Sequence, residues 1–279
     1  MGQSYTVSAR LLAHYRATAR DLPWRRTREP YAVLVSEIML QQTQASRVAP
    51  VFERFLTRFP TLDALAAAPL AAVLREWSGL GYNRRARDLH QIARLCPNGL
   101  PSEVADLAAL PGIGAYTAGA VACFAFGQRV AFADVNIKRV LGRVFLGRPG
   151  TDKEAVDLDA HAMPGRDADL WHHALMDLGA TICSARAPTC AVCPLNARCL
   201  FARSPAVSRT ARVARPAAYP SSDRRVRGAI VRALVKTEAG MTVRALEKTI
   251  GDPRVGRLVD ALTADGLVEA AGRRVRLPG

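Results

Sequence analysis

Apolar residues recur three and four positions apart over nearly all of the first two hundred residues. This spacing is typical of helices that bury one face against a common core. Long alternating runs, which would indicate strands, are absent from this part of the chain. The spacing is clearest at residues 33–40, 48–55, 62–77, 86–95, 105–110, 117–126, 137–145 and 171–178. The sequence therefore predicts a mainly α protein whose first region covers residues 1–203.

The helical pattern stops at the end of that region and resumes about twenty residues later. Pro, Ala, Ser and Arg dominate residues 204–222, which is a composition typical of a linker. Three shorter helical patterns follow, at residues 224–235, 243–250 and 254–264. Two apolar runs, 267–269 and 275–277, flank Gly272 and are predicted to pair as a hairpin. Three helices and a two-stranded wing predict a small winged-helix-like domain over residues 223–279.

Basic residues outnumber acidic residues by 39 to 24, which gives a net charge of +15. This surplus favours a polyanionic partner, because each arginine placed on a phosphate releases a counterion. A GC-rich genome would also enrich arginine, so composition leaves both explanations open. From residue 204 onward the chain carries 15 Arg and Lys against 7 Asp and Glu. We therefore expect auxiliary duplex binding there, with a protein-docking module as the alternative.

The chain contains no stretch that approaches the ~20 apolar residues of a membrane span. Its first residues lack a charged segment followed by an apolar core, so no signal peptide is expected. We predict a cytoplasmic, nucleoid-associated protein without membrane contact. Thiols stay reduced in that compartment, where clustered cysteines indicate a metal rather than disulfides.

Four of the six cysteines lie within 17 residues and are spaced C-x6-C-x2-C-x5-C. They are Cys183, Cys190, Cys193 and Cys199. Thiolates select zinc or an iron–sulfur cluster. Zinc ribbons usually use two C-x2-C pairs, whereas this loop has one pair and wider outer intervals, which favours a [4Fe–4S] cluster. Arg186, Arg198 and Arg203 interleave with the cysteines, so the loop is expected to contact DNA, and the other two cysteines are predicted to be core thiols.

A Gly/Pro-rich turn at residues 110–114 separates two helical patterns. Gly112 and Gly114 allow a tight turn whose backbone N–H groups point outward at a helix N-terminus, where a phosphate can bind. A plain connection between two helices is the alternative. Twenty residues after Gly114 comes Asp134, just ahead of an apolar helix, a position where Asp is usually an N-cap.

This order of features, a helix–hairpin–helix, a downstream Asp and a four-cysteine loop, resembles the helix–hairpin–helix DNA glycosylases over about residues 8–203. Four further segments resemble the adenine DNA glycosylase (MutY) branch: residues 22–25, 36–43, 79–82 and 175–180. The resemblance implies a six-helix barrel with an iron–sulfur cluster domain. It also implies base excision repair, in which adenine mispaired with 8-oxoguanine or guanine is excised.

Excising a purine requires a proton on the leaving base and stabilisation of a cationic sugar, as in glycoside hydrolysis with two carboxyl groups. Glu37 lies among apolar residues, where burial would raise its pKa above the ~4.3 of a free Glu and keep it protonated as a general acid. A solvated helix charge is the alternative for Glu37. Asp134, at a helix start, would stay ionised and face the oxocarbenium centre.

Tyr116 occupies the position where bifunctional relatives, according to the resemblance, carry a lysine. Without that amine no Schiff base can form there, so strand cleavage should not accompany base removal. A core aromatic is the alternative for Tyr116. Asn136 is predicted either to hydrogen-bond the catalytic carboxylates or simply to cap the helix.

The target base must leave the stack, and a side chain must fill the space that it vacates. The resemblance places Gln42 and Tyr82 at the intercalating positions, and Leu40 and Arg25 near the base pocket. Packing in a helical core is the alternative for Tyr82, and a solvated position is the alternative for Gln42. His173 falls at a position that could contact adenine, where relatives often carry Gln or Glu.

The C-terminal region departs from the resemblance, because typical adenine glycosylases carry a second domain there that reads 8-oxoguanine. The principal hypothesis is a monomeric, monofunctional adenine-specific DNA N-glycosylase that acts on double-stranded DNA containing a mismatch or an oxidised guanine, without strong AP-lyase activity. A thymine– or uracil–guanine mismatch glycosylase is the second hypothesis. A non-enzymatic iron–sulfur DNA-binding protein is the third.

Overall fold

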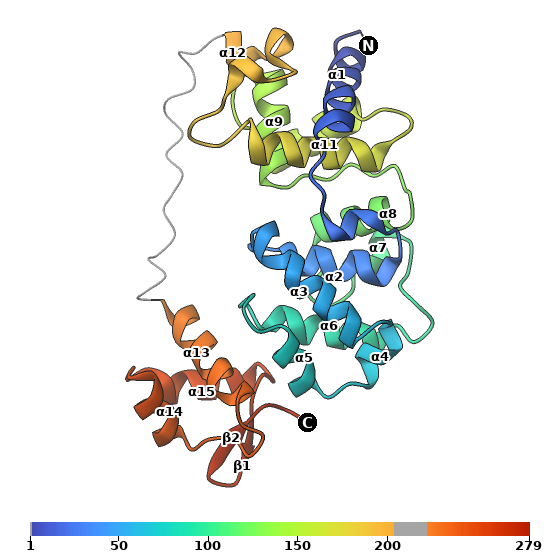
Figure 1. Ribbon diagram of the computed structural model, residues 1–279. Coiled ribbons are helices and arrows are strands. Elements are labelled where there is room, and N and C mark those ends of the chain that lie inside the picture. The colour runs from blue at the N-terminus through green and yellow to red at the C-terminus, as the bar shows by residue number, and fades with distance from the viewer. Residues whose placement is uncertain (1, 204–221) are drawn as a thin grey trace. The chain divides into compact units, whose positions relative to one another are not determined.

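The computed structural model of the chain describes residues 2–203 and 222–279 (Figure 1). Helices make up most of the described residues, and one short antiparallel pair supplies the strands. The prediction of a mainly α protein is confirmed. Apart from Ser222, the predicted linker at 204–222 lies outside the described residues.

The described residues form two compact units that are not continuous in sequence. The first unit comprises residues 2–33, 102–109 and 113–203. The second unit comprises residues 34–101, 110–112 and 222–279. These units divide the chain differently from the predicted domains, whose boundaries at residues 203 and 223 stay a prediction.

The first unit is a group of helices around α9 and α11, which pack against each other while α1 packs on α11 (Figure 1). Its core includes the fully buried Trp171, Leu11 and Ile137. The helices of this unit are α1 (Gly2–Thr18), α7 (Val104–Ala108), α8 (Ala115–Phe124), α9 (Val135–Leu146), α10 (Asp152–Ala162), α11 (Ala168–Thr181) and α12 (Leu200–Arg203), with the short 3₁₀ turns η1 (Pro23–Arg26), η2 (Cys190–Val192) and η3 (Asn196–Arg198).

The second unit contains a group of helices that begins inside α2 (Pro30–Leu40). The others are α3 (Ala45–Arg58), α4 (Leu62–Ala67), α5 (Leu70–Glu76) and α6 (Arg84–Leu95). The apolar pattern at residues 62–77 predicted one helical stretch, whereas the structure has two helices there. The break falls at Pro69, because proline lacks an N–H group and disfavours the helical conformation of the residue before it.

Several helix ends follow from local sequence. Asp134 accepts hydrogen bonds at the start of α9, and Gly147 ends that helix in the left-handed conformation with φ 73°. Thr151 and Glu154 form a reciprocal capping box at the start of α10. These signals act within a single turn, so they operate independently of the tertiary packing.

Three helices and a hairpin form the C-terminal part of the second unit. They are α13 (Asp223–Val235), α14 (Val243–Ile250), α15 (Val255–Ala264), β1 (Glu269–Ala271) and β2 (Arg274–Arg276). The three helices match the predicted ranges to within one residue. The strands pair antiparallel with Ala271 opposite Arg274, around the turn at Gly272. The predicted strand at 267–269 begins later, because Leu267 donates its N–H to the Leu262 carbonyl and is buried against α15.

Candidate active site and nucleic-acid interface

Asp134 is the N-cap of α9, and its partly buried carboxylate has a fixed orientation. One oxygen, Oδ1, accepts hydrogen bonds from the backbone N–H groups of Asn136 and Ile137 at 2.8 and 2.7 Å. The other oxygen, Oδ2, accepts a hydrogen bond from the Asn136 side-chain amide at 2.8 Å. Together these three bonds fix the direction in which the carboxylate points. The predicted N-cap role of Asp134 is confirmed, and the same geometry suits an anion that faces a positive charge.

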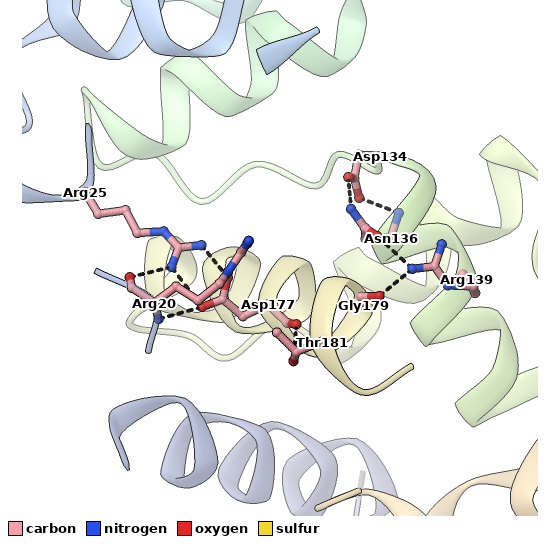
Figure 2. A network of polar contacts seen from close by, with 8 residues as sticks. All are labelled: Arg20, Arg25, Asp134, Asn136, Arg139, Asp177, Gly179 and Thr181. Atoms are coloured by element: carbon pink, nitrogen blue, oxygen red, sulfur yellow. Dashed lines mark hydrogen bonds and ion pairs between the residues drawn. The ribbon is translucent and has the colours of Figure 1, made fainter. Parts of the chain in front are cut away.

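Asn136 is itself held by a second side chain. Its Oδ1 accepts a hydrogen bond from Arg139 Nη2 at 2.7 Å, and the same guanidinium nitrogen donates to the Gly179 carbonyl at 2.7 Å. Figure 2 shows this chain of contacts running from Asp134 through Asn136 and Arg139 to α11. Two roles were considered for Asn136, a hydrogen bond to a carboxylate and a helix cap. The structure shows the hydrogen bond to Asp134, and Asp134 itself is the residue that caps the helix.

Arg25 and Asp177 join two of the segments that carried the resemblance. Arg25 donates from both terminal nitrogens to the Asp177 carboxylate at 2.9 and 2.7 Å, and Arg20 adds a third side-chain bond at 2.7 Å (Figure 2). Burial raises the pKa of Asp177, but these arginines outweigh it and hold that pKa below its ordinary value. The Arg25 side chain is only 9% exposed, so the structure commits it to Asp177 and its contact with DNA stays a prediction.

Gly179, two residues after Asp177, allows α9 and α11 to approach closely. A Cβ atom at this position would lie 2.6 Å from the Asn136 Cβ, which is shorter than any ordinary contact. A larger residue would therefore push Asn136 away from Asp134. The segment 175–180 thus supports two parts of the first unit. Asp177 holds Arg25, and Gly179 leaves room for Asn136 beside Asp134.

Tyr116 lies in the first turn of α8 and is partly buried. Its ring packs edge-on against Phe132 at 5.6 Å between centroids, and Phe132 stacks on His172 at 3.9 Å. His172 is held in turn by the fully buried Asp159, with 2.8 Å between Nε2 and Oδ2. Asp159 also accepts the Phe132 N–H, so this network fixes the segment that leads into Asp134.

The turn that is predicted to bind a phosphate has the tight backbone that its two glycines, Gly112 and Gly114, allow. Gly112 is exposed and left-handed, with φ 73°, and Gly114 is the exposed N-cap of α8. Because glycine offers no side chain, nothing from Gly114 itself occupies the N-terminus of the helix. Phosphate binding at this turn stays a prediction.

The four clustered cysteines line one small hollow between α9, α11 and α12. Their donor set of four thiols fits an iron–sulfur cluster. In the part of the chain that the structure describes, however, no three His, Cys, Asp or Glu side chains converge closely enough to hold a metal ion. Arg186, Arg198 and Arg203 are exposed beside the hollow, as the interleaved charges predicted.

Two arginines of α9, which sequence reasoning missed, connect the carboxylate to the cysteine loop. Arg139 Nε donates to the Cys183 carbonyl at 2.7 Å. Arg143 is buried and donates to the Ser184 and Ala185 carbonyls at 2.7 and 2.9 Å, with Cys183 Sγ 3.3 Å from its Nη1. The helix that Asp134 caps therefore also holds the first cysteine of the loop.

Glu37 lies in the part of α2 that belongs to the second unit, and every residue of this helix from Tyr31 to Met39 is buried. Glu37 is only 5% exposed and its neighbours Val35, Ile38 and Met39 are at most 2% exposed. The alternative of a solvated helix charge is therefore wrong. The apolar burial expected for Glu37 is therefore present, and its role as a proton donor stays a prediction. Leu40 ends the same helix and is partly exposed.

Gln42 and Tyr82 share an unusual backbone conformation. Their φ angles are 55° and 49°, and the described residues contain one other non-glycine residue with positive φ, Asp167. The left-handed conformation costs a non-glycine residue about 1 to 3 kcal/mol, and such strain clusters at functional sites. Gln42 and Tyr82 also line one groove of the second unit. The two residues predicted to enter the duplex are thus brought together.

Arg85, a residue that sequence reasoning missed, holds both strained loops. Its buried guanidinium donates to the carbonyls of Ile38, Met39 and Gln41 at 2.8, 2.9 and 2.5 Å, and to the Gly81 carbonyl at 3.2 Å. Burial lowers the pKa of Arg85 to about 10, so it stays charged at neutral pH. A charged residue at a core-facing helix position was the available signal, because Arg85 lies beside the apolar Ala86 and Leu89 of α6.

His173 is partly buried in the first unit. It stacks on Phe124 with 4.3 Å between ring centroids. Burial, followed by the charge of Arg25, lowers the pKa of His173 to about 3, so its imidazole is neutral at ordinary pH. A contact with adenine stays a prediction.

The structure divides the predicted residues between the two units. The first unit brings together Asp134, Asn136 and the cysteine loop, and it places Tyr116 beside Phe132. The second unit contains Glu37, Leu40, Gln42 and Tyr82.

No helix of the described residues is long and apolar enough to cross a membrane.

These features are typical of enzymes that displace a base from duplex DNA and cut its glycosidic bond. Residues 35–162 match the family model described as "HhH-GPD superfamily base excision DNA repair protein". The chain also resembles a solved structure of a thermostable thymine-DNA glycosylase, with a TM-score of 0.67 and 29% identity over 73% of this chain and 98% of that one. A trapped endonuclease III–DNA intermediate shares the fold, with a TM-score of 0.62 and 22% identity over 71% of this chain and 94% of that one.

Curated relatives identify the branch of the superfamily. The adenine DNA glycosylase of Mycolicibacterium smegmatis is 43% identical over 96% of this chain and 95% of its own length. The adenine DNA glycosylase of Homo sapiens is 40% identical over 68% of this chain and 38% of its own length. The chain belongs to the adenine DNA glycosylase family. The match to the mycobacterial relative leaves about 4% of the chain uncovered, so it includes most of residues 222–279.

Proposed function

We propose that this protein is a monofunctional DNA glycosylase that hydrolyses the glycosidic bond of adenine mispaired with 8-oxoguanine or guanine. The observation that carries the proposal is the orientation of Asp134, whose carboxylate accepts three hydrogen bonds at a helix N-terminus. A negative charge held in this way stabilises a developing cationic sugar without having to reorganise during the reaction. Membership of the adenine DNA glycosylase family supports adenine as the base.

Glu37 is the proposed general acid. Its burial on an apolar helix favours the protonated carboxyl group, which would donate its proton to the departing adenine. As the base leaves, positive charge develops on the sugar and is stabilised by Asp134. Water then adds to the sugar, and the product is an abasic strand. The two carboxyl groups therefore have separate roles, set by their separate environments.

Tyr116 supports the absence of strand cleavage. A lyase needs an amine that forms a Schiff base with the opened sugar. A phenol at this position cannot form one, so the abasic product should persist until alkali or heat breaks it. Borohydride should therefore trap no covalent protein–DNA adduct. Trapping at the wild-type rate of base loss would overturn the monofunctional assignment.

The four loop cysteines are the proposed ligands of a [4Fe–4S] cluster. They line one hollow, and Arg139 and Arg143 hold the start of their loop to α9. A bound cluster would supply a rigid centre for a loop with exposed arginines that faces DNA. Purified protein should be brown and contain about four irons, and Cys193→Ser should lose the cluster while Cys96→Ser should not. A colourless protein with stoichiometric zinc would contradict this assignment.

The C-terminal helices and hairpin are proposed to form a winged-helix-like domain that binds duplex DNA. We also propose that the protein acts as a monomer in the cytoplasm, associated with the nucleoid. Truncation after residue 205 should leave the chemical step intact, because Glu37 and Asp134 lie upstream, and should weaken duplex binding. Loss of single-turnover excision at saturating truncated enzyme would place the C-terminal region in the active site.

The decisive experiment is a panel of duplexes that carry adenine, thymine or uracil opposite 8-oxoguanine or guanine. Single-turnover base release should occur from the adenine duplexes alone. Glu37→Gln should slow adenine release by about 10² to 10⁴-fold, the usual contribution of general acid catalysis, while mismatch binding persists. Release of thymine or uracil with intact adenine would favour the mismatch glycosylase instead, a reading supported by the solved thymine-DNA glycosylase at 29% identity.

A further inference from the structure

A groove of about 940 Å³ lies within the second unit and has two walls. One wall is formed by the strained loops that carry Gln42 and Tyr82, and the other by helix α13 of the C-terminal region. Six arginines line this groove: Arg47, Arg84, Arg85, Arg224, Arg227 and Arg232. None of the described lining residues is acidic. The chemistry of the groove therefore selects an anion.

Three of these arginines are already committed to the protein. Arg85 donates to carbonyl groups, as described above. Arg84 and Arg227 both bind the Asp265 carboxylate. By contrast, Arg47 and Arg232 are exposed, and no described carboxylate lies within ion-pair distance of either. These two positive charges are available to a ligand that enters the groove.

Arg224 joins the C-terminal region directly to the predicted intercalating tyrosine. Its guanidinium lies 4.9 Å from the centre of the Tyr82 ring and donates a hydrogen bond to the Tyr82 hydroxyl. The Arg85 guanidinium also lies 5.1 Å from the same ring centre. Arginine can exchange an aromatic partner for a phosphate, because its planar fork suits both.

The docking of the C-terminal region sets the position of α13. α13 packs on α5, with Val231 and Leu74 among the apolar residues at the groove. Arg87 donates to the Asp265 carbonyl, and the Ala71 N–H donates to the Pro278 carbonyl at 2.9 Å. The arginines of α13 are thus presented from a packed helix and not from a loose tail.

We propose that this groove binds the phosphodiester backbone of a DNA strand, with Arg224 and Arg232 of α13 contacting its phosphates beside Tyr82 and Gln42. An arginine-lined groove with an aromatic ring combines the two features that hold a nucleic-acid strand, backbone charge neutralisation and a surface on which a base can stack. When Tyr82 enters the duplex, Arg224 is released from its ring and hydroxyl and binds a phosphate. This inference rests on the proposed function, in which DNA is the substrate.

The test is the salt dependence of binding of the full-length protein to a duplex with a single adenine·8-oxoguanine mispair. The slope of log K against log salt is negative, and each phosphate contact contributes about −0.9 to it. The Arg224→Ala/Arg232→Ala double variant should therefore have a slope shallower than that of the wild type by about 1.8. At 0.1 M salt its affinity should fall by about tenfold to a hundredfold. The matched control is Arg94→Ala/Lys153→Ala, which removes two exposed charges from α6 and α10, outside the groove.

The control pair should leave both slope and affinity nearly unchanged, and all four substituted residues are exposed, so thermal unfolding should not shift. Equal losses of affinity from both pairs would overturn the groove assignment and indicate a general charge effect. An unchanged slope in the Arg224/Arg232 variant would also overturn the assignment, because it would mean that neither arginine contacts a phosphate. Single-turnover excision at saturating enzyme separates this proposal from the function that it rests on. If the wild type and the Arg224→Ala/Arg232→Ala variant differ in slope but the wild type excises no base, the proposed function is refuted and the groove assignment stands.

Discussion

Asp134 in the first unit and the loops of Gln42 and Tyr82 in the second unit are organised in opposite ways. Asp134 has an ordinary extended backbone, and three short-range hydrogen bonds orient its carboxylate. Gln42 and Tyr82 have strained backbones and depend on Arg85 for support. The catalytic charge proposed for Asp134 would have to be fixed in direction, whereas the intercalating side chains predicted at Gln42 and Tyr82 would have to project from the surface. The two tasks therefore call for different local structures.

The contrast also concerns how far each arrangement reaches along the chain. The donors to Asp134 come from residues at most three positions away. Three acceptors of Arg85, the carbonyls of Ile38, Met39 and Gln41, lie 44 to 47 positions away, while a fourth, the Gly81 carbonyl, lies four positions away. Damage at Asp134 should therefore alter chemistry with little effect on folding, while damage at Arg85 should alter folding and DNA binding together.

The largest expected effect comes from Asp134→Asn. The amide oxygen keeps the two backbone N-cap hydrogen bonds, but the new NH2 group cannot accept the bond from the Asn136 side chain, so the free energy of unfolding should fall by about 1 kcal/mol. Excision should slow on the order of 10³-fold, the size of effect seen when one preorganised electrostatic group is removed from an active site. Single-turnover kinetics and urea unfolding check both halves.

The matched control is Asp152→Asn, which replaces an exposed acid in the first turn of α10. It should excise adenine at the wild-type rate. An Asp134→Asn variant that unfolded several kcal/mol more easily would show that the carboxylate is chiefly structural, and would remove the contrast between the two units.

Arg85→Met should have the next largest effect. The substitution leaves the carbonyls of Ile38, Met39 and Gln41 without this buried donor, and removing one partner of such a network typically costs about 3 kcal/mol. Mismatch binding should weaken as both loops lose their support. Urea unfolding measures the first effect and fluorescence anisotropy the second.

Arg94→Met, an exposed substitution on the same helix, is the control and should change stability by no more than about 0.5 kcal/mol. Arg85→Lys retains the charge but not the planar fork, so it should recover only part of the stability. Full recovery by lysine would mean that charge alone, and not the shared hydrogen bonds, holds the loops.

A third effect is the acid sensitivity that His173 adds to the first unit. Its folded pKa of about 3 lies below the ~6.5 of an unfolded histidine, so the unfolded chain binds the proton first as the pH falls. Stability contributed by the neutral imidazole is therefore present above pH 6.5 and is lost below it. The loss should reach about 2 kcal/mol at pH 5.

His173→Gln should flatten the dependence of the unfolding free energy on pH between 6.5 and 5. The control is His161→Gln, at an exposed position of α10, which should leave the profile unchanged. Equal profiles for wild type and His173→Gln would show that folding does not lower the pKa of His173.

The smallest effect should come from Gln42→Gly, which relieves the left-handed backbone at φ 55°. Glycine adopts that conformation at no steric cost, so the protein should gain up to about 1 kcal/mol of stability. Base release should slow nevertheless, because the side chain that fills the vacated stack is gone. Gln44→Gly is the control, since Gln44 has φ −69° and gains no such relief. A loss of stability at position 42 would show that the loop is not strained.

Much of the fold could be predicted from the sequence, because the signals act within a few residues. The three C-terminal helices appear within one residue of their predicted ranges, and Asp134 caps α9 as expected. The apolar period and the capping residues determine such elements before any packing occurs. The burial of Glu37 was expected from the apolar residues beside it in the sequence, which are Val35, Ile38, Met39 and Leu40.

Only the tertiary structure could show which distant segments support each other. Arg25 and Asp177 are 152 positions apart, and no local pattern indicates that they form an ion pair. The apposition of α13 to the Tyr82 loop likewise follows from docking, through Asp265 and the apolar faces of α5 and α13. The sequence by itself determined the helices, the caps and the clustered cysteines, since these depend on neighbours in the chain. The partners of the buried arginines were decided by packing, because a buried guanidinium requires acceptors and only the folded chain brings them within reach.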